Sequence, residues 1–262
     1  MQGVDNPMLN PEELKRYVRQ ITIPSIGSEG QKKLAKAKVL VVGAGGLGSP
    51  ALYYLAAAGV GAVGIVDPDV VEPNNLNRQI VHFEKDLGEK KVKSAEEKLR
   101  MLNSTIVIKP YPVKLSEDNA QTIIKNYDFV IEASDSFETK FLVNDVCVKL
   151  GIPLVIGGVL QFEGQLMTVL PGISACYRCV IKDIPEEGTY PTTCEMGILG
   201  TTAGVFGVIE ANEAIKYLLF EDPKYLLTNK MLYLDLLYNT FEVITVEKDP
   251  NCKSCRLIKG SS

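Results

Sequence analysis

The sequence lacks the features of several large classes of protein. Its 262 residues carry a net charge of −4, so it has no excess of positive charge. A surface for binding polyanions is therefore not expected, which argues against nucleic acid as the main partner. Residues 1–10 are polar and contain no apolar signal segment, so we expect a cytoplasmic protein.

Histidine is nearly absent, since His82 is the single one. A Ser-His-Asp constellation, and with it that class of hydrolase, is not indicated. A dehydrogenase that transfers hydride often uses an acid–base residue, and His82 would be its candidate. Because His82 directly follows the Arg78 segment, we interpret it as structural.

One stretch could be mistaken for a membrane span. Residues 39–66 contain no charged side chain, and a stretch of this length could cross a bilayer. The stretch also contains glycines and Pro50, and its character changes along its length. A strand, a glycine turn, an alanine-rich helix and a second strand explain it better, so we expect no membrane partner.

Strand and helix patterns alternate through the first part of the chain. Ser49 and Pro50 fit the N-cap and first turn of the helix that follows the glycines. This alternation predicts an α/β fold with a doubly wound, Rossmann-like, mostly parallel sheet. The expected strands are 38–42, 62–66, 105–111, 129–133 and 154–156, and the expected helices are 11–21, 31–37, 51–58, 88–101, 117–125 and 138–150.

The pattern changes in the second half. Strands are expected at 164–170, 231–236 and 240–247, an irregular stretch at 181–200, and a helix at 201–220. Glu210, Glu213 and Lys216 suggest that this helix is amphipathic. We expect the added strands to extend the sheet in antiparallel fashion. No low-complexity linker or repeat is present, which favours a single domain over residues 1–262.

The glycines after the first expected strand predict a nucleotide site. Gly43, Gly45 and Gly48 have the spacing of a dinucleotide-binding turn, and a helix N-terminus follows them. Asp67 ends the next strand, where a carboxylate can accept hydrogen bonds from ribose hydroxyls. The glycines alone leave open whether the nucleotide is a nicotinamide cofactor or ATP.

Residues downstream of Asp67 favour ATP. Asn75 and Arg78 lie just beyond it, and Lys91 comes early in the next helix. Reaction at the α-phosphate of a triphosphate needs cations beside its oxygens, which a nicotinamide site needs less. Asp135 follows another core strand and could hold Mg²⁺. Asp135 or Ser136 also suits a helix N-cap, and the two roles are compatible.

The cysteines fall into three groups. The CxxC pairs Cys176–Cys179 and Cys252–Cys255 supply four thiolates, the ligand set of a structural Zn²⁺ site. Cys194 stands apart in the irregular stretch, where it could be a nucleophile or a small packed residue. Cys147 lies in an expected helix among apolar neighbours, which favours the core.

These features together resemble the ThiF/MoeB family, which shares its adenylation fold with ubiquitin-activating enzymes. The resemblance covers about residues 14–255. One departure is Ser136, where the family usually has the asparagine of an Asp-Asn pair. The matching motifs are RYVRQI, GAGGLGS, VDPDVVEPNNLNRQ, GEKKVKSA, ASDS and the two CxxC pairs.

The resemblance implies ATP-dependent adenylation of the C-terminal glycine of a small β-grasp, ubiquitin-like sulfur-carrier protein that ends in Gly-Gly. Residues 38–158 would form the nucleotide-binding half. Residues 159–262 would form the carrier-binding half, with a crossover loop near 181–200 and the zinc knuckles. Gly46 would face the nucleotide, with Asp67 on the ribose and Asp135 positioning Mg²⁺. The phosphates would be contacted by Asn75, Arg78 and Lys91.

The family also implies a homodimer, in which Arg19 would enter the ATP site of the neighbouring subunit. Cys194 matches a loop cysteine that, in some relatives, links covalently to the activated carrier. Sulfur transfer would need a separate donor, since no rhodanese-like domain is expected here.

Alternatives from other classes remain open at this point. One is an NAD-dependent oxidoreductase, and another is an activating enzyme for a ubiquitin-like protein modifier. A non-catalytic scaffold is disfavoured because Arg78, Lys91 and Asp135 are all present. A relative that dehydrates a tRNA-bound group would be expected to show a basic surface, which the net charge does not suggest.

Overall fold

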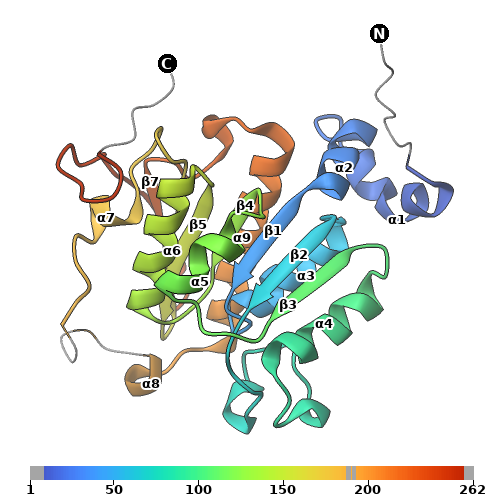
Figure 1. Ribbon diagram of the computed structural model, residues 1–262, viewed down its shortest axis with the longest axis horizontal. Helices are drawn as coiled ribbons and strands as arrows, with labels where there is room; N and C mark the ends of the chain where they lie inside the picture. The colour runs from blue at the N-terminus through green and yellow to red at the C-terminus, as the bar shows by residue number, and fades with distance from the viewer. Residues whose placement is uncertain (1–8, 187–189, 191–192, 257–262) are drawn as a thin grey trace.

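The computed structural model describes residues 9–186, 190 and 193–256. Its strands form one sheet in the order β3-β2-β1-β4-β5-β6-β7-β8 (Figure 1). The first five in sequence are parallel: β1 (Lys38–Val42), β2 (Ala62–Val66), β3 (Val107–Tyr111), β4 (Phe129–Glu132) and β5 (Leu154–Leu160). The last three continue antiparallel: β6 (Glu163–Val169), β7 (Lys230–Asp235) and β8 (Thr240–Thr245). The predicted mixed sheet is therefore confirmed.

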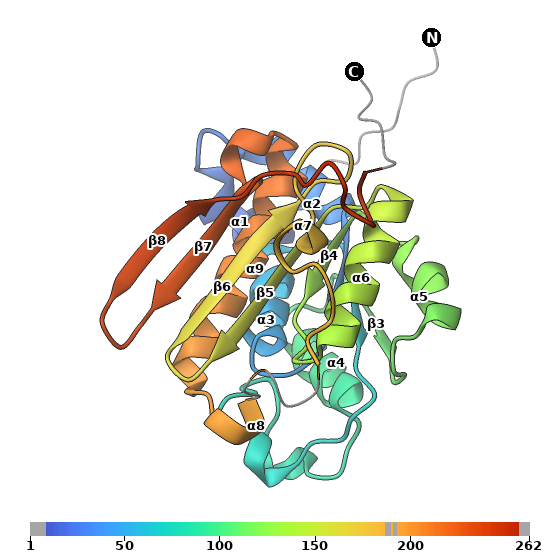
Figure 2. The same cartoon turned by 90° about the vertical axis from the view of Figure 1, so that its left-hand side faces the viewer.

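Helices cover both faces of the parallel part. One face packs against α3 (Gly48–Ala58), α4 (Lys91–Leu102) and α9 (Gly200–Phe220), and the other against α5 (Glu117–Ile124) and α6 (Phe137–Leu150). Figure 1 shows α1 (Pro11–Ile21) and α2 (Gly27–Lys36) at the end of the sheet where β1 begins. Figure 2 shows the β7–β8 hairpin projecting beyond the helices. No described helix is both long and apolar enough to cross a bilayer. The short helices are α7 (Tyr177–Val180), α8 (Thr193–Met196), η1 (Pro73–Asn75), η2 (Glu84–Asp86) and η3 (Pro223–Tyr225).

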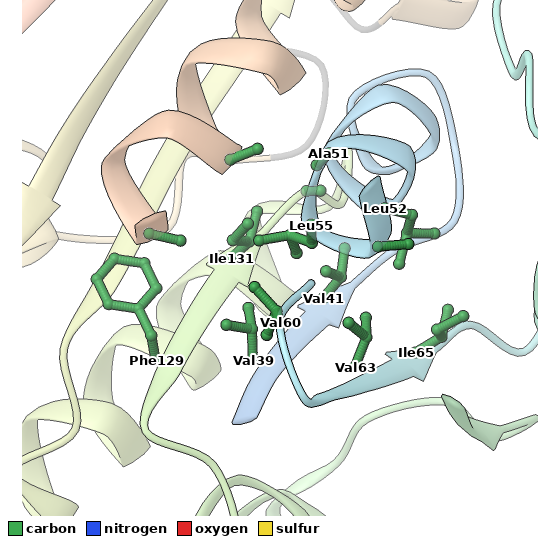
Figure 3. Close-up of a cluster of buried hydrophobic side chains, with 14 of the residues drawn as sticks. Val39, Val41, Ala51, Leu52, Leu55, Val60, Val63, Ile65, Phe129 and Ile131 are labelled. Atoms are coloured by element: carbon green, nitrogen blue, oxygen red, sulfur yellow. The ribbon is translucent and has the colours of Figure 1, made fainter. Parts of the chain in front are cut away.

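Alternation along β1 explains the two cores. Val39 and Val41 face the α3–α9 side, whereas Leu40 and Val42 face the α5–α6 side, and all four are buried. Successive strand residues point to opposite faces, so a continuous apolar run suits a strand covered on both sides. Figure 3 shows the first of these cores, where residues of α3 meet β1, β2 and β4.

The glycine turn after β1 requires two of its glycines for backbone reasons. Gly43 has φ +103°, and a Cβ there would lie 2.7 Å from the Ala133 carbonyl oxygen. A Cβ on Gly48 would lie 1.9 Å from the carbonyl oxygen of Gly43. The predicted N-cap is wrong, because α3 already begins at Gly48. Ser49 lies inside the helix, and its hydroxyl donates to the Gly45 carbonyl at 2.6 Å.

The predicted polar face of α9 is also wrong. Glu210 and Glu213 are 0% and 1% exposed, because α9 is packed between the sheet and helices α2 and α3. Glu213 is compensated by hydrogen bonds from Thr168 Oγ1 at 2.6 Å and Leu227 N–H at 2.8 Å, and by Lys216. Glu210 has no hydrogen-bond partner among the described residues, and burial raises its pKa well above the usual range. Burial therefore favours the neutral form of Glu210.

The titration of Glu210 predicts how stability depends on pH. Since the pKa is raised in the folded state from its ordinary value of 4.5, folding retains a proton that the unfolded chain releases above that pH. Wild-type stability should therefore fall as pH rises above 4.5, by up to about 1.4 kcal/mol per pH unit from this group.

Glu210→Gln removes the proton and keeps the shape. We expect the free energy of unfolding of this variant, minus that of wild type, to increase from pH 5 to pH 8. Urea denaturation at each pH measures this difference. As a control, Glu221→Gln at the exposed C-cap of α9 should show no such trend. Parallel pH profiles for wild type and Glu210→Gln would contradict the assignment.

Candidate functional site

A cavity of about 720 Å³ opens at the carboxyl ends of the parallel strands. In open α/β sheets, ligands bind at this edge, where the strand order reverses. Here the reversal lies between β1 and β4, directly beside the glycine turn. The cavity extends from that turn across β5 to the antiparallel strands β6 and β7, whose Glu163, Gln165 and Tyr233 also line it.

Gly45 and Gly46 form one wall of the cavity. Both line it, and a Cβ on Gly45 would meet nothing closer than Gln79 Nε2 at 3.8 Å. Their N–H groups donate to no acceptor in the described chain, and α3 begins immediately afterwards. Unpaired amides at a helix N-terminus bind phosphate. The predicted nucleotide turn thus has the required form.

Asp67 lies at the end of β2 against the same turn. Its Oδ2 accepts from Ala44 N–H at 2.8 Å and its Oδ1 from Asp69 N–H at 2.9 Å. Burial raises its pKa, while the charge of Lys91 and the two amide bonds oppose the shift. A carboxylate can accept about four hydrogen bonds, so both oxygens retain capacity for ribose hydroxyls.

The predicted cations converge on the cavity. Arg78 and Lys91 both line it. Lys91 is the first residue of α4, and its Nζ lies 3.0 Å from Asp69 Oδ2. The Arg78 guanidinium donates to the Asn74 carbonyl at 2.9 Å, which holds it in place. Asn75 is not among the residues that line the cavity, and its side-chain oxygen accepts from Glu72 N–H at 3.1 Å in the turn that precedes Arg78.

Asp135 and Ser136 both line the cavity, between β4 and α6. Ser136 is the N-cap of α6, accepting from Thr139 N–H at 3.2 Å, as one of the predicted capping alternatives has it. Asp135 is exposed and has no ion-pair partner in the described chain. A free carboxylate has the donor chemistry that Mg²⁺ prefers.

Two cavity residues escaped prediction from the sequence. Lys140 is buried, pairs with Glu132 at the end of β4, and donates to the Ser134 carbonyl at 2.7 Å. It thereby fixes the loop that carries Asp135. The sequence feature that could have indicated Lys140 is Glu132, because an acid in an otherwise apolar strand needs a cationic partner. Gln79 is 5% exposed, and its Oε1 has no partner in the described chain although the residue lines the cavity.

The four paired cysteines meet at a separate place. Their Sγ atoms lie within 4.8 Å of one another, with separations of 3.5, 3.6 and 4.0 Å among them. A Zn²⁺ ion with Zn–S bonds of about 2.3 Å makes a tetrahedron with edges of about 3.8 Å. The cluster that the sequence predicted from Cys176, Cys179, Cys252 and Cys255 therefore exists and could hold zinc. Cys147 is buried in the core, as expected.

Comparison with known proteins agrees with this geometry. The ThiF family model matches residues 17–254. The chain belongs to the ThiF family. It is 43% identical over 247 residues to the SAMP-activating enzyme E1 of Haloferax volcanii, covering 94% of this chain and 90% of that one. It is 44% identical over 249 residues to the sulfur carrier protein adenylyltransferase of Thermus thermophilus, covering 93% and 91%.

Among solved structures, E. coli MccB with ATP has the same fold. The TM-score is 0.76 at 23% identity, and the match covers 95% of this chain and 75% of that one.

Two residues that the ThiF resemblance singled out lie apart from the cavity or outside the description. Arg19 is exposed on α1, whose neighbour Gln20 donates to the Ala58 carbonyl at the C-terminal end of α3. Arg19 is therefore at the opposite end of the sheet from its own chain's cavity. The backbone of Cys194 lies in α8, and its side chain is outside the described residues.

Zinc content tests the cysteine cluster. We expect one zinc ion per chain, and Cys179→Ser should lower both the bound zinc and the melting temperature, because the site loses a ligand. Cys147→Ser is the matched control, since it places a hydroxyl in the apolar core and should cost stability without loss of zinc. Elemental analysis of both variants decides the point, and equal zinc loss in both would contradict the assignment.

Proposed function

We propose that this chain is an ATP-dependent adenylyltransferase that activates the C-terminal glycine carboxylate of a small β-grasp carrier protein ending in Gly-Gly. One observation carries the proposal. A single cavity joins the unpaired amides of Gly45 and Gly46 to Arg78, Lys91 and the free carboxylate of Asp135, and then continues to the antiparallel strands. A triphosphate would lie in the first part, and an extended peptide tail would lie in the second.

The relatives support the same assignment. The Thermus protein is named as a sulfur carrier protein adenylyltransferase and the Haloferax protein as a SAMP-activating enzyme, and each is matched over nine-tenths of its length. Adenylation requires the carrier's carboxylate to lie beside the α-phosphate of ATP. Residues of β6 and β7 line the part of the cavity away from the glycine turn, where such a tail would lie.

The reaction is an in-line displacement at phosphorus. A carboxylate oxygen of the carrier's terminal glycine forms a bond to the α-phosphorus, and the bond from that phosphorus to the bridging oxygen breaks. The electron pair stays on the bridging oxygen, so pyrophosphate leaves and an acyl-adenylate remains. Charge accumulates on the phosphate oxygens as the bonds exchange, and fixed cations beside them lower the barrier.

Each cavity residue has a place in this step. Asp67 holds the ribose, and the amides of Gly45 and Gly46 bind phosphate oxygens. Arg78 and Lys91 stabilise the developing charge, with Asn75 positioning Arg78. When Mg²⁺ is bound, Asp135 would hold it, and the ion would neutralise charge on the phosphates.

The geometry of His82 argues against the oxidoreductase alternative, for which it was the candidate acid–base residue. Both ring nitrogens of His82 are engaged, with Ser94 Oγ at 2.8 Å and the Ala44 carbonyl at 2.9 Å, and the side chain is 4% exposed. His82 therefore cannot meet a substrate. Activation of a protein modifier would use the same first step as activation of a sulfur carrier, and sulfur transfer would draw on a separate donor.

A covalent step can follow adenylation. The Cys194 thiolate would attack the acyl carbon, forming a C–S bond while the C–O bond to AMP breaks and AMP leaves. The position of α8 supports this, because Ile198, just beyond it, lines the cavity.

Loss of Lys91 should reduce adenylation sharply. Lys91→Ala removes a cation from the transferring phosphate, and ATP–pyrophosphate exchange with a cognate carrier should fall about a hundred-fold. Lys93→Ala is the matched control on the same helix, because Lys93 is exposed and pairs with Glu96. If Lys91→Ala exchanges as fast as Lys93→Ala, Lys91 has no part in the reaction.

Arg19 and Arg78 provide a test of the homodimer. If Arg19 completes the neighbouring subunit's site, Arg19→Ala and Arg78→Ala are each inactive alone. A mixed dimer keeps one complete site, built from Arg78 of one chain and Arg19 of the other. Co-refolding equal amounts should therefore restore roughly a quarter of wild-type exchange, since half the dimers are mixed and each has one of two sites. No recovery would place Arg19 outside the site.

A further inference from the structure

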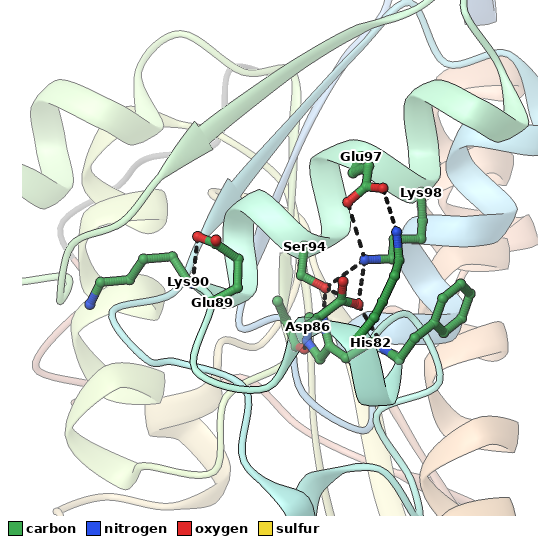
Figure 4. Close-up of polar contacts among 10 residues, drawn as sticks. His82, Asp86, Glu89, Lys90, Ser94, Glu97 and Lys98 are labelled. Atoms are coloured by element: carbon green, nitrogen blue, oxygen red, sulfur yellow. Dashed lines mark hydrogen bonds and ion pairs between the residues drawn. The ribbon is translucent and has the colours of Figure 1, made fainter.

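A buried polar network lies directly behind the glycine turn and takes no part in the reaction described above. It consists of His82, Asp86, Ser94 and Lys98, which come from the segment after Arg78 and from α4. Figure 4 shows these side chains pointing toward one another. All four are 5% exposed or less. Burying so many polar groups is costly unless they are hydrogen-bonded, so their arrangement calls for an explanation.

Hydrogen-bond chemistry fixes the tautomer of His82. The Ala44 carbonyl lies 2.9 Å from Nε2 and can only accept, so Nε2 carries the proton. Burial lowers the pKa of His82 to about 4, and the nearby charges of Lys91 and Lys98 act in the same direction. The imidazole is therefore neutral near pH 7, and Nδ1 must accept a hydrogen bond.

Ser94 supplies that hydrogen bond. Its one hydroxyl proton could go to His82 Nδ1 at 2.8 Å or to Asp86 Oδ2 at 3.0 Å. Asp86 already accepts from Lys98 and from Phe83 N–H at 2.8 Å, whereas Nδ1 has no other donor in the described chain. Lys98 in turn donates to Ser94 Oγ at 3.1 Å. The donors thus run in one direction, from Lys98 through Ser94 and His82 to the Ala44 carbonyl.

The end of this chain is a peptide of the nucleotide turn. Ala44 is held at its carbonyl by His82 and at its N–H by Asp67 Oδ2 at 2.8 Å. The next two residues are Gly45 and Gly46, which carry unpaired amides and form one wall of the cavity. Glycines have wide conformational freedom, so their orientation depends on what anchors the residue before them.

We propose that His82 is a positioning residue for the nucleotide, which clamps the Ala44 peptide against Asp67 so that the Gly45 and Gly46 amides face the phosphates. This inference rests on the proposed function, because it takes the phosphates to be those of ATP. The clamp spans the two ends of the nucleotide, since Asp67 contacts the ribose and the glycines contact the phosphates. A preorganised turn binds ATP without first losing conformational entropy.

The test is ATP affinity, measured by calorimetry with Mg²⁺–ATP and no carrier. His82→Phe keeps a ring in the site but removes the donor to Ala44, so Kd for ATP should rise about ten-fold. His82→Gln keeps a donor near the position of Nε2 and should recover most of the affinity. In carrier-dependent exchange, His82→Phe should raise KM for ATP and leave KM for the carrier unchanged.

A matched control separates positioning from general loss of stability. Asn103 is also fully buried, and its Nδ2 donates to the Ala56 carbonyl at 2.8 Å, at the opposite end of the sheet. Asn103→Leu should therefore lower the melting temperature without changing Kd for ATP. If it weakens ATP binding as much as His82→Phe does, the positioning role is overturned.

Ser94→Ala covers the case in which His82→Phe does not fold. It leaves Nδ1 without its donor and frees the imidazole to move, so Kd for ATP should rise in the same direction but less. An unchanged Kd in whichever of the two variants folds overturns this inference alone. A wild-type protein that binds no ATP overturns the proposed function and the inference with it.

Discussion

The close approach of the glycine turn to the end of β4 is the constraint on which the site depends. Gly43 lies so near Ala133 that no side chain fits between them, and Gly43 N–H donates to the Val66 carbonyl at 2.8 Å. The turn is thus tied at once to the ends of β2 and β4. Because of this contact, Asp67 after β2 and Asp135 after β4 line the same cavity. A Cβ at position 43 would push the two strand ends apart.

The buried charges near that contact are paired with charged residues from outside the glycine turn. Asp67 and Lys91 are both buried beside the cavity, and Asp69 lies between them, bonded to Asp67 through its N–H and to Lys91 through its carboxylate. Lys140 and Glu132 repeat the pattern behind Asp135. A buried ion whose partner were missing would be strongly destabilising, so the cations are fixed before any nucleotide arrives. Catalysis gains from this, since charges already in place need not reorganise during the reaction.

Local patterns predicted much of this arrangement, and long-range packing decided the rest. The strand, turn and helix around Gly43 could be predicted because spacing and apolar runs are properties of neighbouring residues. The burial of Glu210 could not be predicted from the sequence. A helix sequence shows which residues share a face but not how many faces other elements cover. The same limit applies to Ser49, because α3 begins at Gly48, two residues before the Pro50 that a Ser49 N-cap would make the first helical residue. The hydrogen bond from Glu72 N–H to Asn75 Oδ1 depends on a turn whose geometry the sequence does not specify.

The cysteine cluster and the cavity are joined through α6. Tyr177, between Cys176 and Cys179, lines the cavity and packs edge-on against Phe141 of α6, with ring centroids 5.3 Å apart. Its N–H donates to Asn144 Oδ1 at 2.9 Å, one turn further along the same helix. The N-terminal end of α6 also places Ser136 and Lys140 in the lining of the cavity. A metal bound by Cys176 and Cys179 would therefore also stabilise one wall of the cavity. The cysteine cluster would contribute to function by supporting α6.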